Sequence, residues 1–163
     1  MIKLENFDRS DYSELISWIK DEEELMQFGG PNFSFPLTVE QLDKSQEDKM
    51  RHSFKVVDVE TNKTIGHCEV YLLEGTAKLA RILIGDETQR GKGVGKEIVK
   101  ALIEFSVNVL QKKNIELNVF DWNVGAIKCY ESVGFRINPN KRLERKVNDE
   151  TWIAINMVMQ AEG

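Results

Sequence analysis

The feature that most constrains this chain is a turn in which three glycines alternate with other residues, Gly91-Lys92-Gly93-Val94-Gly95. An apolar segment expected to form a strand, residues 77–84, precedes the turn, and an apolar face at helical spacing over 94–109 follows it. Glycine lets a ligand approach the backbone closely, and the first turn of a helix carries N–H groups without partners. The turn therefore predicts a phosphate site, and the alternative is a tight turn that merely needs glycine.

Two common phosphate-binding patterns do not fit this turn. A Walker loop places Ser or Thr directly after Gly-Lys, but Gly93 follows Lys92 here. A Rossmann turn requires a further glycine where Lys96 stands, and its acidic residue about 20 positions later is also missing. The sequence therefore disfavours a nucleotide hydrolase and a dinucleotide-binding protein.

The rest of the chain predicts one domain that mixes strands and helices. Alternating or apolar segments predict strands near 2–7, 53–59, 65–73, 77–84, 115–119, 142–147 and 151–159. Capping residues and helical spacing predict helices near 10–19, 38–49, 94–109 and 123–133. The segment Phe28–Pro36 is expected to be an ordered loop. We therefore expect an α/β (α+β) fold with a mixed, mostly antiparallel twisted sheet of about seven strands and about four helices.

Composition excludes several classes of protein. The chain has 163 residues, of which 41% are hydrophobic and 30% charged, which suits one globular domain rather than a disordered chain. The net charge of −5 argues against nucleic acid as a main partner, and no apolar run reaches the length of a membrane span. The N-terminus lacks the apolar core of a secretory signal, and two distant cysteines suggest a reducing compartment, so a cytoplasmic location is expected. Metal-ligand spacings are missing, so no metal is expected.

A longer pattern around the glycine turn resembles a known family. Residues 90–95, R-x-x-G-x-G, resemble the pyrophosphate-binding motif Q/R-x-x-G-x-G/A of the GCN5-related N-acetyltransferase (GNAT) family. Residues 123–135, N-x-x-A-I-x-x-Y-x-x-x-G-F, are similar to the family's next motif and lie at its usual distance downstream. Residues 84–86 and the region 18–38 look like the branch that contains ribosomal-protein N-terminal acetyltransferases and similar small-amine enzymes.

The resemblance implies a single acetyltransferase domain over residues 1–163. Its acetyl-CoA-binding core is expected at 77–135, and acceptor-side helices and a loop at 1–50. The implied reaction moves the acetyl group of acetyl-CoA to a primary amine by direct attack in a ternary complex; the alternative is a non-catalytic module that binds acetyl-CoA. The residues implied to bind the cosubstrate are Ile82, Leu83, Ile84, Gln89, Arg90, Gly91, Lys92, Gly93, Val94, Gly95, Lys96, Asn123, Lys128 and Tyr130.

The resemblance also assigns a proton donor. Tyr130 matches the motif tyrosine, whose phenol can donate a proton to the departing CoA thiolate, and the alternative role of Tyr130 is core packing. The general base stays open, because Glu69, Glu116 and His67 all lie on expected strands near the presumed cleft and a chain of water molecules would serve equally well. An acyl-enzyme at Cys129 is disfavoured, since no histidine stands near it in the motif.

The acceptor is expected to bind where the N-terminal helices and the loop after them cover the edge of the sheet. Trp18, Phe28, Phe33 and Phe35 are expected to wall its pocket, with ordinary core packing as the alternative. The acidic excess of the chain lies within residues 1–50, which predicts either a solvated surface or a face toward a cation. We therefore expect a small cationic amine or a protein N-terminus as acceptor, no nucleic acid or membrane partner, and a monomer or a homodimer.

Overall fold

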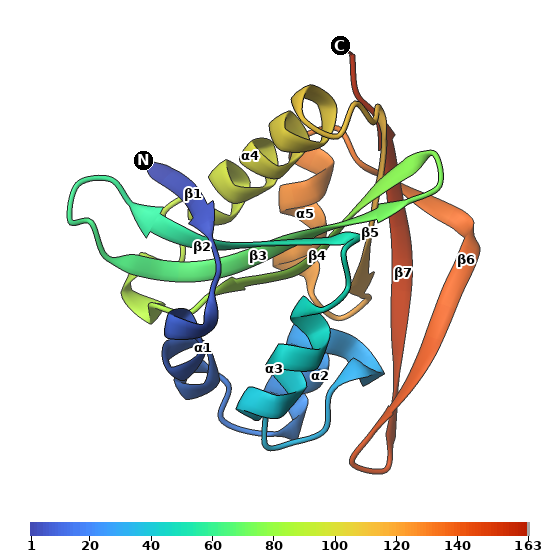
Figure 1. Cartoon of the computed structure of the whole chain (residues 1–163). Coiled ribbons are helices and arrows are strands. Elements are labelled where there is room, and N and C mark those ends of the chain that lie inside the picture. Colours follow the sequence, from blue (N-terminus) through green and yellow to red (C-terminus); the bar gives the residue numbers. More distant parts are fainter. Residues whose placement is uncertain (163) are drawn as a thin grey trace.

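One seven-stranded sheet organises the part of the chain that the computed structural model describes, residues 1–162 (Figure 1). The strand order is β1-β2-β3-β4-β5-β7-β6, and every neighbouring pair is antiparallel except β4 and β5, which are parallel. The strands are β1 (Ile2–Asn6), β2 (Arg51–Asp58), β3 (Thr64–Leu73), β4 (Thr76–Ile84), β5 (Asn114–Phe120), β6 (Arg136–Val147) and β7 (Glu150–Gln160). The predicted mixed, mostly antiparallel sheet is confirmed.

Helices cover both faces of this sheet. Helices α1, α2 and α3 lie on one face, and α4 and α5 lie on the other (Figure 1). Across residues 1–162 the helices are α1 (Tyr12–Trp18), α2 (Glu22–Gly29), α3 (Val39–Gln46), α4 (Val94–Asn108) and α5 (Val124–Ser132), with 3-10 turns η1 (Arg9–Asp11), η2 (Gly30–Asn32) and η3 (Glu87–Gln89). None of them is long and apolar enough to cross a membrane.

Helix α2 is the element that the sequence pattern did not predict. Its first turn consists of three glutamates, which favour the positive end of a helix, and Asp21 caps it by accepting a hydrogen bond from the N–H of Glu24 at 2.8 Å. The helix ends at Gly29, and the C-cap residue Gly30 has a φ of +62°. The expected loop over Phe28–Pro36 was therefore too long, because its first residues complete a helix.

Local residue chemistry explains how other elements begin and turn. The two-residue turn between β6 and β7 is made by Asn148 and Asp149, whose φ angles of 47° and 67° are ones that Asn and Asp tolerate. The predicted closing hairpin is thus confirmed, although β6 begins six residues earlier than expected. Of the two predicted caps, Ser10 and Asp11, Asp11 stands at the N-cap position of α1, but its side chain does not cap this helix; it accepts from the N–H of Asp8 at 2.9 Å instead.

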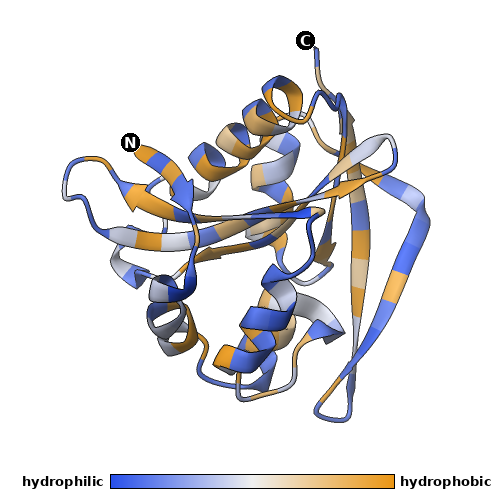
Figure 2. Cartoon of the chain, in the orientation of Figure 1, coloured by the Kyte–Doolittle hydropathy of each residue, from blue (hydrophilic) through white to orange (hydrophobic). Residues whose placement is uncertain are grey.

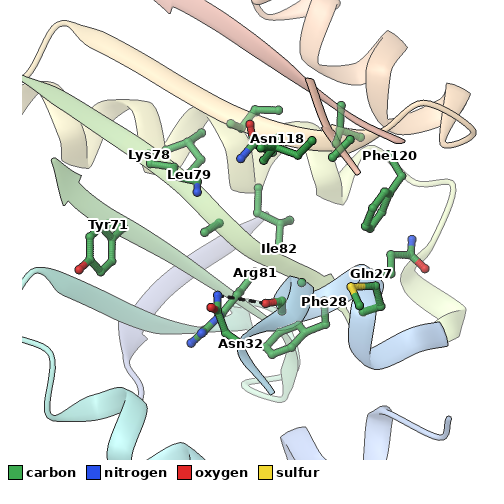
Figure 3. Close-up of a pocket in the computed structure, with 18 of the residues that line it drawn as sticks. Gln27, Phe28, Asn32, Tyr71, Lys78, Leu79, Arg81, Ile82, Asn118 and Phe120 are labelled. Atoms are coloured by element: carbon green, nitrogen blue, oxygen red, sulfur yellow. Dashed lines mark hydrogen bonds between the residues drawn. The ribbon is translucent and has the colours of Figure 1, made fainter. Parts of the chain in front are cut away.

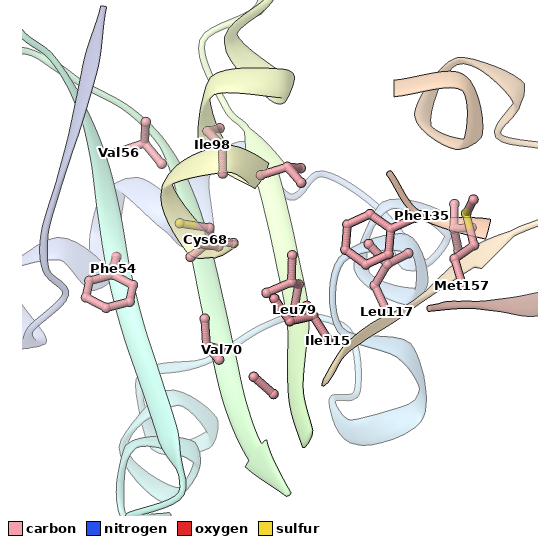
Figure 4. Packing of buried hydrophobic residues seen from close by; sticks show 14 of the residues in the cluster. Phe54, Val56, Cys68, Val70, Leu79, Ile98, Ile115, Leu117, Phe135 and Met157 are labelled. Carbon is pink, nitrogen blue, oxygen red and sulfur yellow. The ribbon is translucent and has the colours of Figure 1, made fainter. Parts of the chain in front are cut away.

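The larger apolar core lies between the sheet and α4. Ile98 and Leu102 of α4 are fully buried against strand residues such as Val70 and Leu79, and Ile98 points toward the strands in Figure 4. Burying one such side chain stabilises the fold by roughly 1.5–3 kcal/mol. This packing holds the first turn of α4 against the end of β4, where the glycine turn lies.

The opposite face of the sheet has a second, smaller apolar core under α1, α2 and α3. Leu15, Leu25 and Leu42 are among its fully buried members. Unlike the first core, this face also buries charged side chains, including Glu69 and Arg81. At the end of the sheet, the edge strand β6 is largely hydrophilic, whereas its neighbour β7 is largely apolar (Figure 2).

Candidate active site

Strands β4 and β5 separate near the middle of the sheet. They pair only where Ala77–Leu79 lies beside Ile115–Leu117, although β4 continues to Ile84 and β5 to Phe120. The facing edges of the two strands beyond these pairs have no partner strand in the described sheet. Such an edge offers main-chain donors and acceptors to an extended ligand.

A bulge in β4 accompanies this separation. His67 of β3 pairs with Leu83 and Glu69 pairs with Ala80, so two residues of β4 lie opposite the one residue between them on β3. Arg81, in the bulge, has a φ of +50°. The bulge changes which side chains face each core: Leu79 before it and Ile82 after it both pack on the α4 side, whereas Arg81 turns to the opposite face.

A cavity of about 550 Å³ opens between the separated strands (Figure 3). Its walls come from Lys78–Ile82 of β4, Leu117–Phe120 of β5 and Met26–Gly29 of α2, while β3 and the β6–β7 hairpin close its far end. A cavity of this size suits a small ligand or the end of a longer one. Tyr130 and Asn123 line it as well, so the motif around α5 opens into the same space as β4.

The glycine turn lies at the other end of β4 and is open. Gly91 and Gly93 have φ angles of +76° and +80°, and a β-carbon added at either position would meet nothing within 4 Å. Gly93 is the N-cap of α4 and supplies no side-chain bond to it. Over the described chain, no protein group accepts a hydrogen bond from the N–H groups of residues 91–96. The turn therefore presents free donors at the positive end of a 15-residue helix, as an anion site requires.

Arg90 has a structural role beside this turn. Its Nε and Nη2 atoms donate to the carbonyl oxygen of Ile84 at 3.2 and 2.9 Å. The guanidinium therefore ties the turn to the last residue of β4. Lys92 and Lys96, in contrast, are exposed beside the free N–H groups, where they can add positive charge.

Tyr130 keeps its proton at neutral pH. Burial, with a smaller contribution from Cys129, raises the pKa of Tyr130 to about 12. Its ring packs edge-on against Phe135, with 6.1 Å between centroids, and no described residue bonds to its hydroxyl. Asn123 accepts from the N–H of Ala126 at 3.3 Å, so its predicted helix cap is confirmed.

Glu69 is the centre of a buried charge cluster on the face opposite α4. Its carboxylate lies 2.7 Å from Arg51 Nη1, 3.3 Å from Arg81 Nη1 and 2.7 Å from His67 Nε2. Burial alone would raise the pKa of Glu69, but the hydrogen bond to His67 and the neighbouring positive charges outweigh it and lower the pKa to about 2. Glu69 therefore stays ionised and weakly basic, and it does not line the cavity among the described residues.

The other expected site residues fall into two groups. Among the four aromatic side chains, Phe28 lines the cavity in the described structure, whereas Trp18 packs on Gly85, Phe33 lies under the Arg81 guanidinium at 4.3 Å, and Phe35 is exposed. These positions favour the packing alternative for Trp18 and Phe33, whereas Phe35 neither packs in the core nor lines the cavity.

Glu116 and Lys128 were also expected at the site, but neither is among the described residues that line the cavity. Glu116 is 3.6 Å from Lys141 Nζ, and Lys128 is exposed on α5. The prediction from sequence missed Lys78 and Arg145, which do line the cavity. The sequence offered one indication for Lys78, which is a charged residue between two apolar residues of a buried strand. It offered no indication for Arg145, because only the fold brings β6 to the cavity wall.

Comparison with known proteins defines the family. A family model described as an acetyltransferase (GNAT) domain matches residues 2–136. Because this match covers most of the chain, the protein belongs to the GNAT acetyltransferase family, and the fold expected from the resemblance is confirmed. The likeness to the ribosomal-protein branch stays a prediction.

Individual relatives match over shorter stretches. The chain is 41% identical over 64 residues to a spermine/spermidine N-acetyltransferase of Bacillus subtilis, which is 39% of this chain and 41% of that protein. It is 38% identical over 53 residues to an aminoglycoside N(6')-acetyltransferase type 1 of Klebsiella pneumoniae, covering 32% of this chain and 26% of that one. The matched segments thus span less than half of these curated relatives.

Solved structures match over nearly the whole chain. The structure of spermidine N-acetyltransferase from Vibrio cholerae in complex with CoA and spermine has a TM-score of 0.80 at 20% identity, over 98% of this chain and 95% of that one. The aminoglycoside acetyltransferase AAC(6')-Ib in complex with ribostamycin and coenzyme A has a TM-score of 0.77 at 20% identity, over 98% and 93%. At this identity the likeness concerns the fold.

Proposed function

We propose that this protein is an N-acetyltransferase that moves the acetyl group of acetyl-CoA to a primary amine. The observation that carries the proposal is that one strand, β4, ends in an open turn of free N–H groups and also forms the wall of a cavity containing Tyr130. A phosphate site and a reaction chamber joined in this way suit a long cosubstrate with its charge at one end and its thioester at the other. Family membership supports the same activity.

The chain offers a place for each part of acetyl-CoA. The N–H groups of residues 91–96, with Lys92 and Lys96 beside them, would hold the pyrophosphate. The unpaired edge of β4 between Ala80 and Ile84 would hold the pantetheine arm through its amides. The thioester would then lie in the cavity, next to Tyr130.

The proposed reaction is a direct transfer. The neutral amine attacks the thioester carbonyl, a C–N bond forms, the C–S bond breaks, and Tyr130 donates its proton to the departing thiolate. The proton that the new amide nitrogen then releases restores the phenol of Tyr130. The raised pKa keeps the phenol protonated at neutral pH, so its proton is available when the thiolate develops beside it. Holding both reactants in one cavity supplies much of the acceleration by proximity.

The proton that leaves the ammonium needs a separate acceptor. Glu69 is a poor candidate, because its pKa of about 2 makes it a weak base and three side chains already bond to it. Glu116 is paired with Lys141. We therefore assign this step to water in the cavity.

The names of the relatives suggest polyamines and aminoglycosides for the first panel of acceptors, and the expectation from sequence adds protein N-termini. The experiment incubates the full chain with acetyl-CoA and each amine, follows the release of CoA thiol and identifies the acetylated amine by mass spectrometry. Turnover of at least one primary amine is expected. Tight CoA binding without turnover of any amine would instead identify a binding module and overturn the enzymatic proposal.

A further inference from the structure

The cavity wall away from the glycine turn is basic. Four positively charged residues line it, and Asp48 is the acidic one among the described lining residues (Figure 3 labels Lys78 and Arg81). The four are Arg51, Lys78, Arg81 and Arg145. This charge is the reverse of what a binding site for a polycation would present.

Two of these cations are neutralised inside the protein. Arg51 and Arg81 share the carboxylate of Glu69, and the carboxylate of Asp48 accepts from the hydroxyl of Tyr71 at 2.7 Å close to both. This part of the wall is therefore a structural cluster with nearly balanced charge.

Lys78 and Arg145 are different, because neither forms an ion pair within residues 1–162. Arg145 Nη1 donates to the main-chain carbonyl of Glu144 at 3.0 Å. Glu116 lies opposite Lys78 on β5, but its carboxylate contacts Lys141 Nζ. Burial, together with the nearby positive charges of Lys141, Arg51 and Arg145, lowers the pKa of Lys78 in spite of Glu116.

The distance along β4 excludes the CoA phosphates as partners of Lys78. Lys78 is four residues from Ile82 and six from Ile84, which at about 3.3 Å per residue is roughly 13 and 20 Å. The glycine turn lies beyond Ile84, so the pyrophosphate and Lys78 belong to opposite ends of the strand. Lys78 therefore faces the acceptor, and Arg145 lines the same cavity.

We propose that the acceptor is a small amine that also carries a carboxylate, which binds to Lys78 and Arg145 while the amine reaches the thioester beside Tyr130. This inference rests on the proposed acetyl transfer and names the substrate class of the same site. It separates this chain from the relatives named for spermine and spermidine, whose substrates carry only positive charge. Arg145 contributes a planar, forked donor and Lys78 a point charge, which together suit a carboxylate.

The test uses amines of equal length that differ in one terminal group. With acetyl-CoA saturating, kcat/KM is measured for 4-aminobutanoate, butylamine and 1,4-diaminobutane, and again for the five- and six-carbon series, with spermidine and α-amino acids included. We expect at least one carboxylate-bearing amine to exceed the neutral amine of its series about tenfold and the diamine by more. A preference for diamines or spermidine, or equal rates within each series, would overturn the inference and leave the acetyl transfer standing.

Two variants locate the effect. Lys78→Gln and Arg145→Gln should each lower kcat/KM for the carboxylate-bearing amine about tenfold and leave that for the neutral amine and the Kd of CoA unchanged. Lys100→Gln, on the exposed side of α4, is the matched control and should change none of these values. Unchanged selectivity in both cavity variants, with their thermal unfolding unaltered, would contradict the assignment.

A binding measurement keeps the inference separable from catalysis. Butanoate and butylamine are titrated into the CoA complex, and the chemical shifts of cavity residues are followed by NMR. Butanoate should shift them at lower concentration than butylamine, and Lys78→Gln should abolish this difference. If no amine is acetylated but butanoate still binds in this way, the anion site stands and the proposed reaction fails; if butanoate causes no shift, the anion site is wrong.

Discussion

The two faces of the sheet present different kinds of chemistry to a ligand. On the α4 face the core is apolar, and the groups offered to a ligand are main-chain N–H groups at the glycine turn. On the face under α1, α2 and α3, the sheet buries Glu69 with its arginines and offers side chains from several distant strands. Main-chain recognition depends on local geometry, whereas side-chain recognition depends on how distant segments meet. A short sequence motif can therefore specify the cosubstrate side, which is the glycine turn. Only the assembled fold specifies the acceptor side, which is the cavity wall formed by distant strands.

Gly93→Asp should weaken the binding of CoA at the glycine turn and leave the acceptor side of the cavity unchanged. The residue needs a φ of +80°, and the substitution adds a negative charge and a side chain to the open hollow where the phosphates would lie. Backbone strain, charge repulsion and lost main-chain bonds together should weaken CoA binding about 1000-fold, which is about 4 kcal/mol. Isothermal titration calorimetry measures this.

The matched control for that variant is Gly75→Asp in the turn between β3 and β4. Gly75 has a φ of +75° and equally open space around it, so the substitution carries the same strain and the same charge. Both variants should lose similar unfolding free energy, but only Gly93→Asp should lose CoA affinity. Equal CoA affinity in the two would show that the glycine turn holds no phosphate.

Glu69→Gln should destabilise the fold on the face under α1, α2 and α3 and leave the CoA site at the glycine turn unchanged. The change leaves Arg51 and Arg81 without their shared counter-ion in a buried place, which should lower the free energy of unfolding by about 3 kcal/mol. Urea denaturation measures the loss, and Glu131→Gln, exposed on α5, is the control. The Kd of CoA should stay the same, because the cluster and the glycine turn lie on different elements.

The same cluster predicts a pH dependence. Folding lowers the pKa of Glu69 from its ordinary value of 4.5 to about 2, so its ionisation stabilises the fold fully above about pH 4.5. That contribution is lost as the pH falls from 4.5 toward 2. The variant Glu69→Gln should show a flatter loss of stability over this range than the unmodified protein. Parallel curves for the two would mean that Glu69 carries no such linkage.

Much of the fold and of the cosubstrate side could be predicted from sequence, because the determining residues are neighbours in the chain. Alternation placed the hairpin of β2 and β3, and the glycines of 91–95 marked the turn before α4. Helix α2 was missed because Gly29 and Gly30 resemble a loop, although Asp21 and the glutamates after it carry the signals of a helix start.

The acceptor side could not be predicted in the same way, because its wall is assembled from distant segments. Lys78 and Arg145 share a cavity only because β4 separates from β5 and the β6–β7 hairpin closes the far end. The acidic composition of residues 1–50 suggested a cation as ligand, yet much of that charge lies on exposed positions and the cavity wall is basic. Trp18 was expected at the pocket, but it packs on Gly85, where a larger residue would collide with its ring.

Tyr130→Phe tests whether Tyr130, which lies in the cavity between the cosubstrate side and the acceptor side, donates a proton in the reaction. Removal of the phenol proton should lower kcat about 100-fold by stopping protonation of the thiolate, while the Kd of CoA changes little. Steady-state kinetics and calorimetry measure the two quantities. Tyr12→Phe is the matched control: burial and a bond to Asp43 raise the pKa of Tyr12 to about 12 as well, but Tyr12 lies in the second core, away from the cavity. Unaffected turnover in Tyr130→Phe would assign the tyrosine to packing alone.

Asn123 has the smallest expected effect and distinguishes two roles at one position. Its side chain caps α5 by accepting from the N–H of Ala126, and it also lines the cavity. Asn123→Ala removes the cap and should lower the free energy of unfolding by about 1 kcal/mol.

Asn123→Ser separates the cap from contact with the cosubstrate. Serine caps a helix about as well as asparagine, so this variant should keep most of the stability. If the amide of Asn123 also bonds to the pantetheine arm, both variants should weaken CoA binding by a similar few-fold factor, because neither retains the amide. A loss of CoA affinity in Asn123→Ala alone would instead mean that the residue acts only by holding α5, and with it Tyr130, in place, so that the cosubstrate side too would depend on side-chain packing.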